Sequence, residues 1–92
     1  MADSLRLDKF LWFARIVKTR ALAQNVAEKG RLRLNGRVVD KAHAPVRPGD
    51  VLSFARQGAV RVIRVEVLPA RRGPASEAHT LYSELTSEGR GA

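Results

Sequence analysis

The 92-residue sequence contains no cysteine, few aromatic residues and no long apolar run. Without cysteine, neither disulfides nor thiolate zinc sites can stabilise a fold, so the core must come from side-chain packing alone. Apolar runs stay well short of the about 20 residues that cross a bilayer, and the N-terminus does not resemble a secretory signal. We therefore expect one small, soluble, cytoplasmic domain that does not interact with membranes.

Arrangements of residues that support catalysis or metal binding are also missing. His43 and His79 have no partners at metal-ligand spacing, the serines lack a recognisable base, and there is no glycine-rich phosphate loop. Asp8 falls in the first turn of an expected helix and Asp50 in an expected turn, so both favour structural roles. The sequence predicts a protein that is not an enzyme and has no cofactor, no metal and no small-molecule substrate.

Acidic residues are scarce relative to basic ones. Seventeen Lys and Arg against nine Asp and Glu give a net charge of +8, which favours polyanionic partners, with nucleic acid ahead of anionic membranes. The excess is concentrated, because residues 6–41 hold ten basic side chains and only three acidic ones. From composition alone, a GC-rich genome, which raises arginine content, explains the many arginines as well as nucleic-acid binding does.

Residues 6–36 combine two helical patterns with a hairpin signal. Apolar side chains share one face of a first helix starting at Arg6: Leu7, Phe10, Leu11, Ala14 and Val17. Thr19 is a candidate N-cap for a second helix, which ends at Gly30 because glycine tolerates a left-handed conformation. Asn35 and Gly36 then predict a type I′ turn between two strands, with Leu32 and Leu34 facing the core.

The second half predicts more strands and a last helix. Strands are expected at 51–55 and 59–68, after a turn at 48–50. In the longer strand the alternation slips between Val62 and Ile63, which either a bulge or burial of both faces would explain. After a loop at 69–74, apolar residues at helical spacing predict an amphipathic helix that docks on the sheet: Ala75, Ala78, Leu81, Tyr82 and Leu85. Leu81, Tyr82 and Leu85 are expected to be buried.

Together these patterns predict an α+β fold. Two N-terminal helices should pack on a small, mainly antiparallel sheet of about four strands, followed by a short C-terminal helix. The single domain should span residues 6–86, with flexible ends at 1–5 and 87–92.

Basic side chains from both helices, their connection and the hairpin are predicted to share a surface. RNA phosphates would match it, whereas solvated surface charge is the alternative reading. Trp12 lies away from the apolar stripe and either stacks on an unpaired base or, as we favour, packs under the C-terminal helix. With so few aromatic residues, recognition of folded RNA by shape and phosphates fits better than a base-stacking platform.

Three segments carry a family resemblance: residues 6–11 (RLDKFL), 18–21 (KTRA) and 30–36 (GRLRLNG). Their order and spacing resemble the RNA-binding domain named after small-subunit ribosomal protein S4. Within that group the chain is most similar to the family of 15-kDa bacterial heat-shock proteins that bind the ribosome, because residues 11–15 and 71–78 also match. Members of that family continue with a long charged extension, which has no counterpart after Ala92.

The resemblance implies a non-catalytic, bacterial, cytoplasmic protein that binds large-subunit ribosomal RNA. Its expected target is the free large subunit that still carries a nascent chain on tRNA, in rescue or recycling under heat shock and other stress, and we expect a monomer. The RNA-facing positions that it implies, with Arg37 added from the same basic stretch, are Arg6, Lys9, Arg15, Lys18, Thr19, Arg20, Gln24, Lys29, Arg31, Arg33, Asn35 and Arg37.

Three other functions remain open at this point. The chain could be the RNA-binding domain of an RNA-modifying enzyme, or a general tRNA- or rRNA-binding module. It could also bind a polypeptide or anionic lipid through the last amphipathic helix, if the apolar side chains of that helix are exposed.

Overall fold

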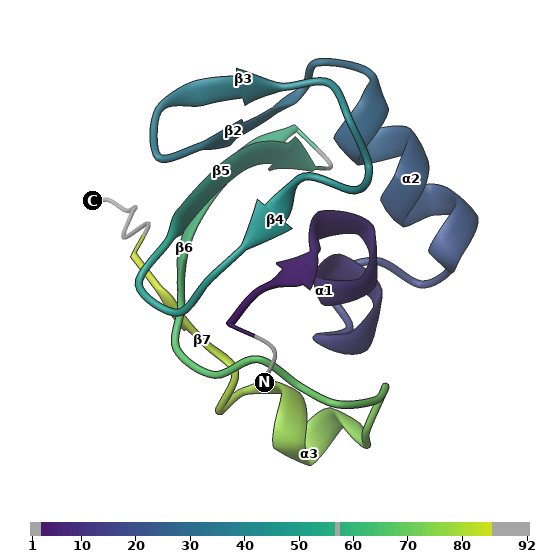
Figure 1. Ribbon diagram of the computed structural model, residues 1–92, viewed down its shortest axis with the longest axis vertical. Coiled ribbons are helices and arrows are strands. Elements are labelled where there is room, and N and C mark those ends of the chain that lie inside the picture. The colour runs from purple at the N-terminus through teal and green to yellow at the C-terminus, as the bar shows by residue number, and fades with distance from the viewer. Residues whose placement is uncertain (1–2, 57, 86–92) are drawn as a thin grey trace.

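The computed structural model describes residues 3–56 and 58–85, which form two helices on one face of an antiparallel sheet (Figure 1). In chain order the elements of this part are β1 (Leu5–Arg6), α1 (Leu7–Phe13), α2 (Arg20–Glu28), β2 (Leu32–Leu34), β3 (Arg37–Val39), β4 (Pro45–Val46), β5 (Val51–Arg56), β6 (Ala59–Val65), α3 (Ala75–Ala78) and β7 (Tyr82–Glu84). The larger sheet has the order β3-β2-β5-β6-β7, and β1 pairs with β4 in a separate small sheet. The predicted α+β architecture is confirmed.

The register of the larger sheet separates a core face from an open face. Leu32 of β2 is fully buried opposite Phe54 of β5, on the side covered by α1 and α2. The next residue, Arg33, lies opposite Val38 and Ser53 and points to the other side. Because side chains alternate along a strand, the hairpin places its arginines outside and its leucines inside, as predicted.

The first helix is shorter than its apolar periodicity predicts. α1 ends at Phe13, and Arg15 takes a left-handed conformation with φ of 58°. The backbone N–H groups of Ile16 and Val17 both donate to the carbonyl of Leu11, which folds the chain back on the end of the helix. Val17 is therefore buried as expected, although it reaches the core from a turn.

The start and end of α2 follow the predicted local chemistry. The hydroxyl of Thr19 accepts the N–H of Leu22 at 3.0 Å, as an N-cap does. Gly30 follows the last turn with φ of 69°, the left-handed conformation expected just after a helix. Ala23 and Ala27 are fully buried, and such small side chains allow α2 to pack closely.

β6 has neither the bulge nor the burial on both faces that its apolar pattern predicts as alternatives. It pairs with β5 without interruption from Val51↔Arg64 to Arg56↔Ala59, so there is no bulge in this pairing. Ile63 and Val65 face the core, but Val60 on the other face is 60% exposed, so the strand is not buried on both sides. The strand also ends at Val65, earlier than predicted.

The predicted C-terminal helix divides into a helical turn and a strand. α3 ends at Ala78, and the chain then extends so that Tyr82 lies opposite Val65 at the edge of the sheet. Backbone pairing to the free edge of β6 thus replaces further helical turns. Leu81 and Tyr82 are half-buried, but Leu85 is 41% exposed, which contradicts its expected burial.

At the ends of the chain, the structure departs from or lies beyond the expected boundaries. Leu5, expected in a flexible end, pairs with Val46 in the small sheet. The expected flexible tail at 87–92 falls outside the described residues.

The turn between β2 and β3 offers a clean test of backbone conformation. Asn35 and Gly36 have φ of 52° and 85°, as a type I′ turn requires, and a Cβ on Gly36 would contact nothing within 4 Å. We expect Gly36→Ala to lower the free energy of unfolding by about 1 kcal/mol through backbone strain alone. Urea denaturation measures this, and Arg37→Ala, in an exposed neighbour without positive φ, should change it by less than about 0.5 kcal/mol. Equal effects of the two changes would contradict the strain argument.

Candidate RNA-binding surface

The carboxylate of Asp8, at the start of α1, is fully buried and connects the two helices. It accepts two hydrogen bonds from the guanidinium of Arg6, from Nε at 3.0 Å and from Nη2 at 2.9 Å. It also accepts the backbone N–H of Lys9 at 2.8 Å and the side-chain amide of Gln24, from α2, at 3.4 Å. Two predicted RNA-facing side chains, those of Arg6 and Gln24, are thus oriented by one buried carboxylate.

These contacts keep Asp8 ionised. Burial by itself raises the pKa of the Asp8 carboxyl, but it is outweighed by the hydrogen bonds and charge of Arg6 and by the bonds from Lys9 and Gln24. The net pKa lies below the ordinary aspartate value of 3.8. Because the folded-state pKa is depressed, ionised Asp8 stabilises the fold above that ordinary value, and this stabilisation is lost as pH falls through the lower pKa.

The connection between α1 and α2 presents a second group of predicted residues. Lys18, Thr19 and Arg20 are all exposed around the start of α2, and Lys9 is half-exposed on α1. The hydroxyl of Thr19 is used as the cap of α2, so its role in the isolated protein is structural. This corner therefore presents cations on a backbone that is fixed by the cap and by the turn after α1.

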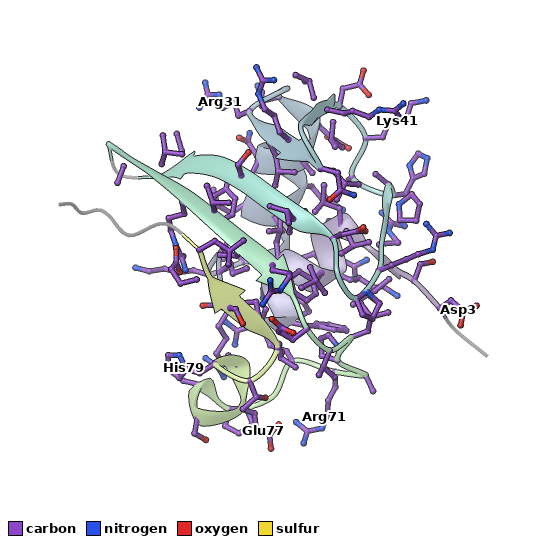
Figure 2. The ribbon with its side chains drawn as sticks, turned by 90° about the vertical axis from the view of Figure 1, so that its left-hand side faces the viewer. Asp3, Arg31, Lys41, Arg71, Glu77 and His79 are labelled. Atoms are coloured by element: carbon purple, nitrogen blue, oxygen red, sulfur yellow. The ribbon has the colours of Figure 1, made fainter. Side chains whose placement is uncertain are left out.

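A third group lies at the hairpin. The side chains of Lys29, Arg31 and Arg37 are exposed, and Figure 2 shows Arg31 at the opposite end of the molecule from His79. Asn35 is also exposed, but its side-chain Nδ2 donates to the carboxylate of Asp50 at 3.0 Å and its side-chain Oδ1 accepts the backbone N–H of Val51 at 2.9 Å. Asn35 therefore connects the hairpin turn to the start of β5.

Arg15 lies apart from these groups, against the loop that precedes α3. Its Nε donates to the carbonyl of Gly73 at 2.7 Å. In the opposite direction, Nε of Arg72 donates to the carbonyl of Trp12 at 3.1 Å, and the guanidinium lies 5.4 Å from the centre of the indole. The two arginines thus fasten residues 72 and 73 to the end of α1.

Trp12 packs against the core, as favoured, but its hydrogen bonds and ring contacts in the described part of the chain include Arg72 of the loop before α3 and no residue of α3 itself. Its indole is half-buried, packs against the core, and lies beside Phe13 and under Arg72. The sequence did not predict the contact between Arg72 and Trp12. The available signal was a single tryptophan in an arginine-rich chain, since arginine often pairs with aromatic faces.

Charge is neutralised unevenly across the described residues. Besides Arg6–Asp8, the ion pairs all lie in the second half of the chain: Arg61–Glu84 at 2.7 Å, Arg64–Glu66 at 3.0 Å and Arg71–Glu77 at 3.9 Å. The hydrogen bond from Arg61 to Glu84 also raises the pKa of the Arg61 guanidinium. In contrast, none of the described basic residues from 9 to 41 has a carboxylate within 4 Å. The positive field is therefore strongest around the helix pair and hairpin.

Membrane-spanning helices and metal-binding clusters are both missing from the described part of the chain. Its helices include none that is long and apolar enough to cross a membrane. Its His, Asp and Glu side chains form no group of three or more that could hold a metal ion.

The fold is that of an S4 domain protein. The S4 domain family matches residues 5–52, and the chain belongs to this family, which confirms the resemblance seen in residues 6–36. The chain is 39% identical to the RQC P-site tRNA stabilizing factor of Listeria innocua over 93 residues, covering 98% of this chain and all of that protein. It is 40% identical to Heat shock protein 15 of Escherichia coli K12 over 83 residues, which cover 90% of this chain.

The chain spans only 62% of the length of that Escherichia coli protein. Among solved structures, Heat Shock Protein 15 of Vibrio cholerae superposes with a TM-score of 0.82 at 37% identity, covering 88% of this chain and 81% of that one. That structure is described as trimeric, so the comparison does not support the expected monomer.

Replacing Asp8 tests its role as the connection between helices. We expect Asp8→Asn to lower the free energy of unfolding by about 1–3 kcal/mol at pH 7, because Arg6 loses its charged partner. The difference from wild type should shrink as pH falls below 3.8, because Asp8 is protonated first in the unfolded chain and then, at its lower pKa, in the folded protein. Urea denaturation at pH 7 and pH 3 measures both effects. Asp40→Asn, at an exposed position, is the control, and a difference that is the same at both pH values would contradict this account.

Fluorescence of the single tryptophan tests whether Trp12 packs or stacks on RNA. Arg72→Ala should shift its emission to longer wavelength, because the indole loses the guanidinium that covers it. Arg71→Ala, next to it but exposed, should leave the emission unchanged. RNA titrated into the wild-type protein should also leave the emission unchanged, and strong quenching would favour base stacking instead.

Proposed function

We propose that the chain is a non-catalytic RNA-binding protein that binds large-subunit ribosomal RNA. The observation that carries this proposal is the concentration of cations without carboxylate partners around α1, α2 and the β2–β3 hairpin. Phosphates of folded RNA neutralise such a surface and release counterions, which drives binding. The membership in the S4 domain family supports the same partner.

The proposed contacts differ in how firmly the protein holds them. Arg6 and Gln24 are pre-oriented by Asp8, so they lose little side-chain entropy on binding. Lys9, Lys18 and Arg20 provide mobile charges around the start of α2. The hairpin adds Lys29, Arg31, Arg33 and Arg37, although Nη1 of Arg33 also donates to the carbonyl of Gly36 at 3.4 Å. The shorter internal bonds of Arg15, Thr19 and Asn35 leave those three a supporting role.

The proposed cellular target is the free large ribosomal subunit that carries a nascent chain on tRNA, in the bacterial cytoplasm. One group of relatives is named for stabilising tRNA in the P site and another for heat shock, and both names agree with rescue of stalled subunits. A contact with tRNA is therefore part of the proposal. Co-sedimentation should show more protein on large subunits with peptidyl-tRNA than on empty ones, and equal amounts on both would remove the tRNA contact.

Charge reversal at Arg20 tests the surface itself. We expect Arg20→Glu to weaken binding to a structured fragment of large-subunit RNA about tenfold, which corresponds to 1.4 kcal/mol, and to lower the slope of log K against log salt by about 1. Filter binding at several salt concentrations measures both, while thermal unfolding should change by less than about 0.5 kcal/mol. A comparable loss of stability would make Arg20 structural.

Arg71→Glu is the matched control for this experiment. It makes the same change in net charge in the exposed loop before α3, at the opposite end of the molecule from Arg31 (Figure 2). We expect it to weaken RNA binding by less than about twofold at physiological salt, where charges more than about 8 Å apart are screened. Equal losses in the two variants would show that net charge, and not this surface, determines RNA binding.

A further inference from the structure

Figure 2 looks onto the open face of the larger sheet, the face away from α1 and α2. This face has a groove. It encloses about 180 Å³ beside the end of α2, the start of β2 and the adjacent parts of β5 and β6. The residues that form it, called the sheet groove below, include Gly30, Arg31, Arg33, Ser53, Ala55 and Val60.

The sheet groove combines positive charge with exposed apolar surface. Arg31 and Arg33 are exposed and have no carboxylate within 4 Å, and none of the described lining residues is acidic. Val60 of β6 is 60% exposed in the groove and lies opposite Ala55 of β5. Half-buried Ser53 of β5 lies opposite Arg33 of β2. Val38, on the other side of Arg33, adds exposed apolar surface next to the groove.

This mixture matches the parts of a nucleotide. Guanidinium groups bind phosphate through paired N–H donors, and an apolar floor accepts the flat face of a base or the carbon side of a ribose. A site for a whole drug-sized ligand usually encloses roughly 300–1,000 Å³. The sheet groove is smaller and open to solvent, so it suits the phosphate and one face of a single nucleotide with the remainder in water.

The chain also makes the groove continuous with the proposed RNA surface. Lys29 closes α2, Gly30 reverses the backbone in a left-handed conformation, and Arg31 enters the open face one residue later. An RNA strand that contacts the end of α2 would therefore reach Arg31 and Arg33 without leaving the protein. The absence of lining carboxylates suits any anionic ligand. The continuity with the proposed RNA surface at the end of α2 favours RNA over an acidic peptide, which would not need that continuity.

We propose that the sheet groove binds one unpaired nucleotide of the RNA that the helix pair recognises. This inference rests on the proposed RNA-binding function, and it divides the predicted residues between two faces. Arg6, Lys9 and Arg20 contact folded RNA, whereas Arg31 and Arg33 hold the phosphate of a single-stranded nucleotide against Val60.

Single-stranded and structured RNA separate the two faces experimentally. Hexauridine titrated into the ¹⁵N-labelled protein should shift the amide signals of Ser53, Ala55 and Val60. Val60→Asp, which puts a carboxylate on the groove floor, should weaken hexauridine binding at least fivefold. Val67→Asp is the matched control, because Val67 is 52% exposed but does not line the groove, and it should weaken binding less than twofold.

A second pair of measurements distinguishes failure of the groove from failure of the proposed function. Arg20→Glu should weaken binding of the structured ribosomal fragment and leave hexauridine binding within twofold of wild type. If hexauridine shifts only signals of α1 and α2, the groove is not a nucleotide site while RNA binding stands. If neither RNA binds, the proposed function itself fails.

Two other occupants would also overturn the proposal. Shifts of the groove signals by hexaglutamate but not by hexauridine would assign the groove to an acidic polypeptide. Broadening of the same signals with protein concentration, in the absence of RNA, would assign it to a second copy of the chain. Circular dichroism of each variant confirms that a loss of binding does not reflect loss of the fold.

Discussion

The ion pair between buried Asp8 and exposed Arg6 is the interaction on which the helix part of the proposed surface depends. Removing a carboxylate from water is costly, and that cost is offset only when charged and hydrogen-bonding partners surround it. Arg6 supplies two donors, the backbone of Lys9 a third and Gln24 a longer fourth. Of these bonds, the one from Gln24 reaches α2, whereas the others hold Arg6 and the start of α1, so one carboxylate orients side chains of both helices.

Acidic residues in the rest of the described chain have a different effect. Glu66, Glu77 and Glu84 lie beside arginines of the second half and cancel their charge locally. The serine hydroxyl of Ser83 and then Arg64 lower the pKa of Glu66, so this carboxylate stays ionised beside its partner. A net charge spread evenly over the surface would attract any polyanion from all sides, whereas this arrangement limits the strongest attraction to the helix pair and hairpin.

Elements fixed by local chemistry could be predicted from the sequence, and those fixed by distant contacts could not. The cap at Thr19, the helix end at Gly30 and the turn at Asn35 follow from the residue types at those positions, and all were confirmed. The early end of α1 is followed by the left-handed backbone of Arg15, whose side chain donates to the carbonyl of Gly73, 58 residues away. The edge strand β7 likewise depends on the free edge of β6. Pairing with this edge replaces the helix that the apolar spacing predicts after the four residues of α3.

Arginine shows the same limit within the candidate site. Arg15 and Arg72 each donate to a backbone carbonyl, at 2.7 and 3.1 Å, and so they hold the loop before α3 against α1. Arg20 and Arg31 carry the same charge but have no such internal bond among the described contacts. Spacing in the sequence cannot separate arginines that bond within the protein from arginines that are free to bind RNA. The N–H groups of a guanidinium donate to carbonyl and phosphate oxygens alike. The separation requires the partner atoms, which are known only once the chain has folded, and it reduces the number of arginines that remain free for RNA.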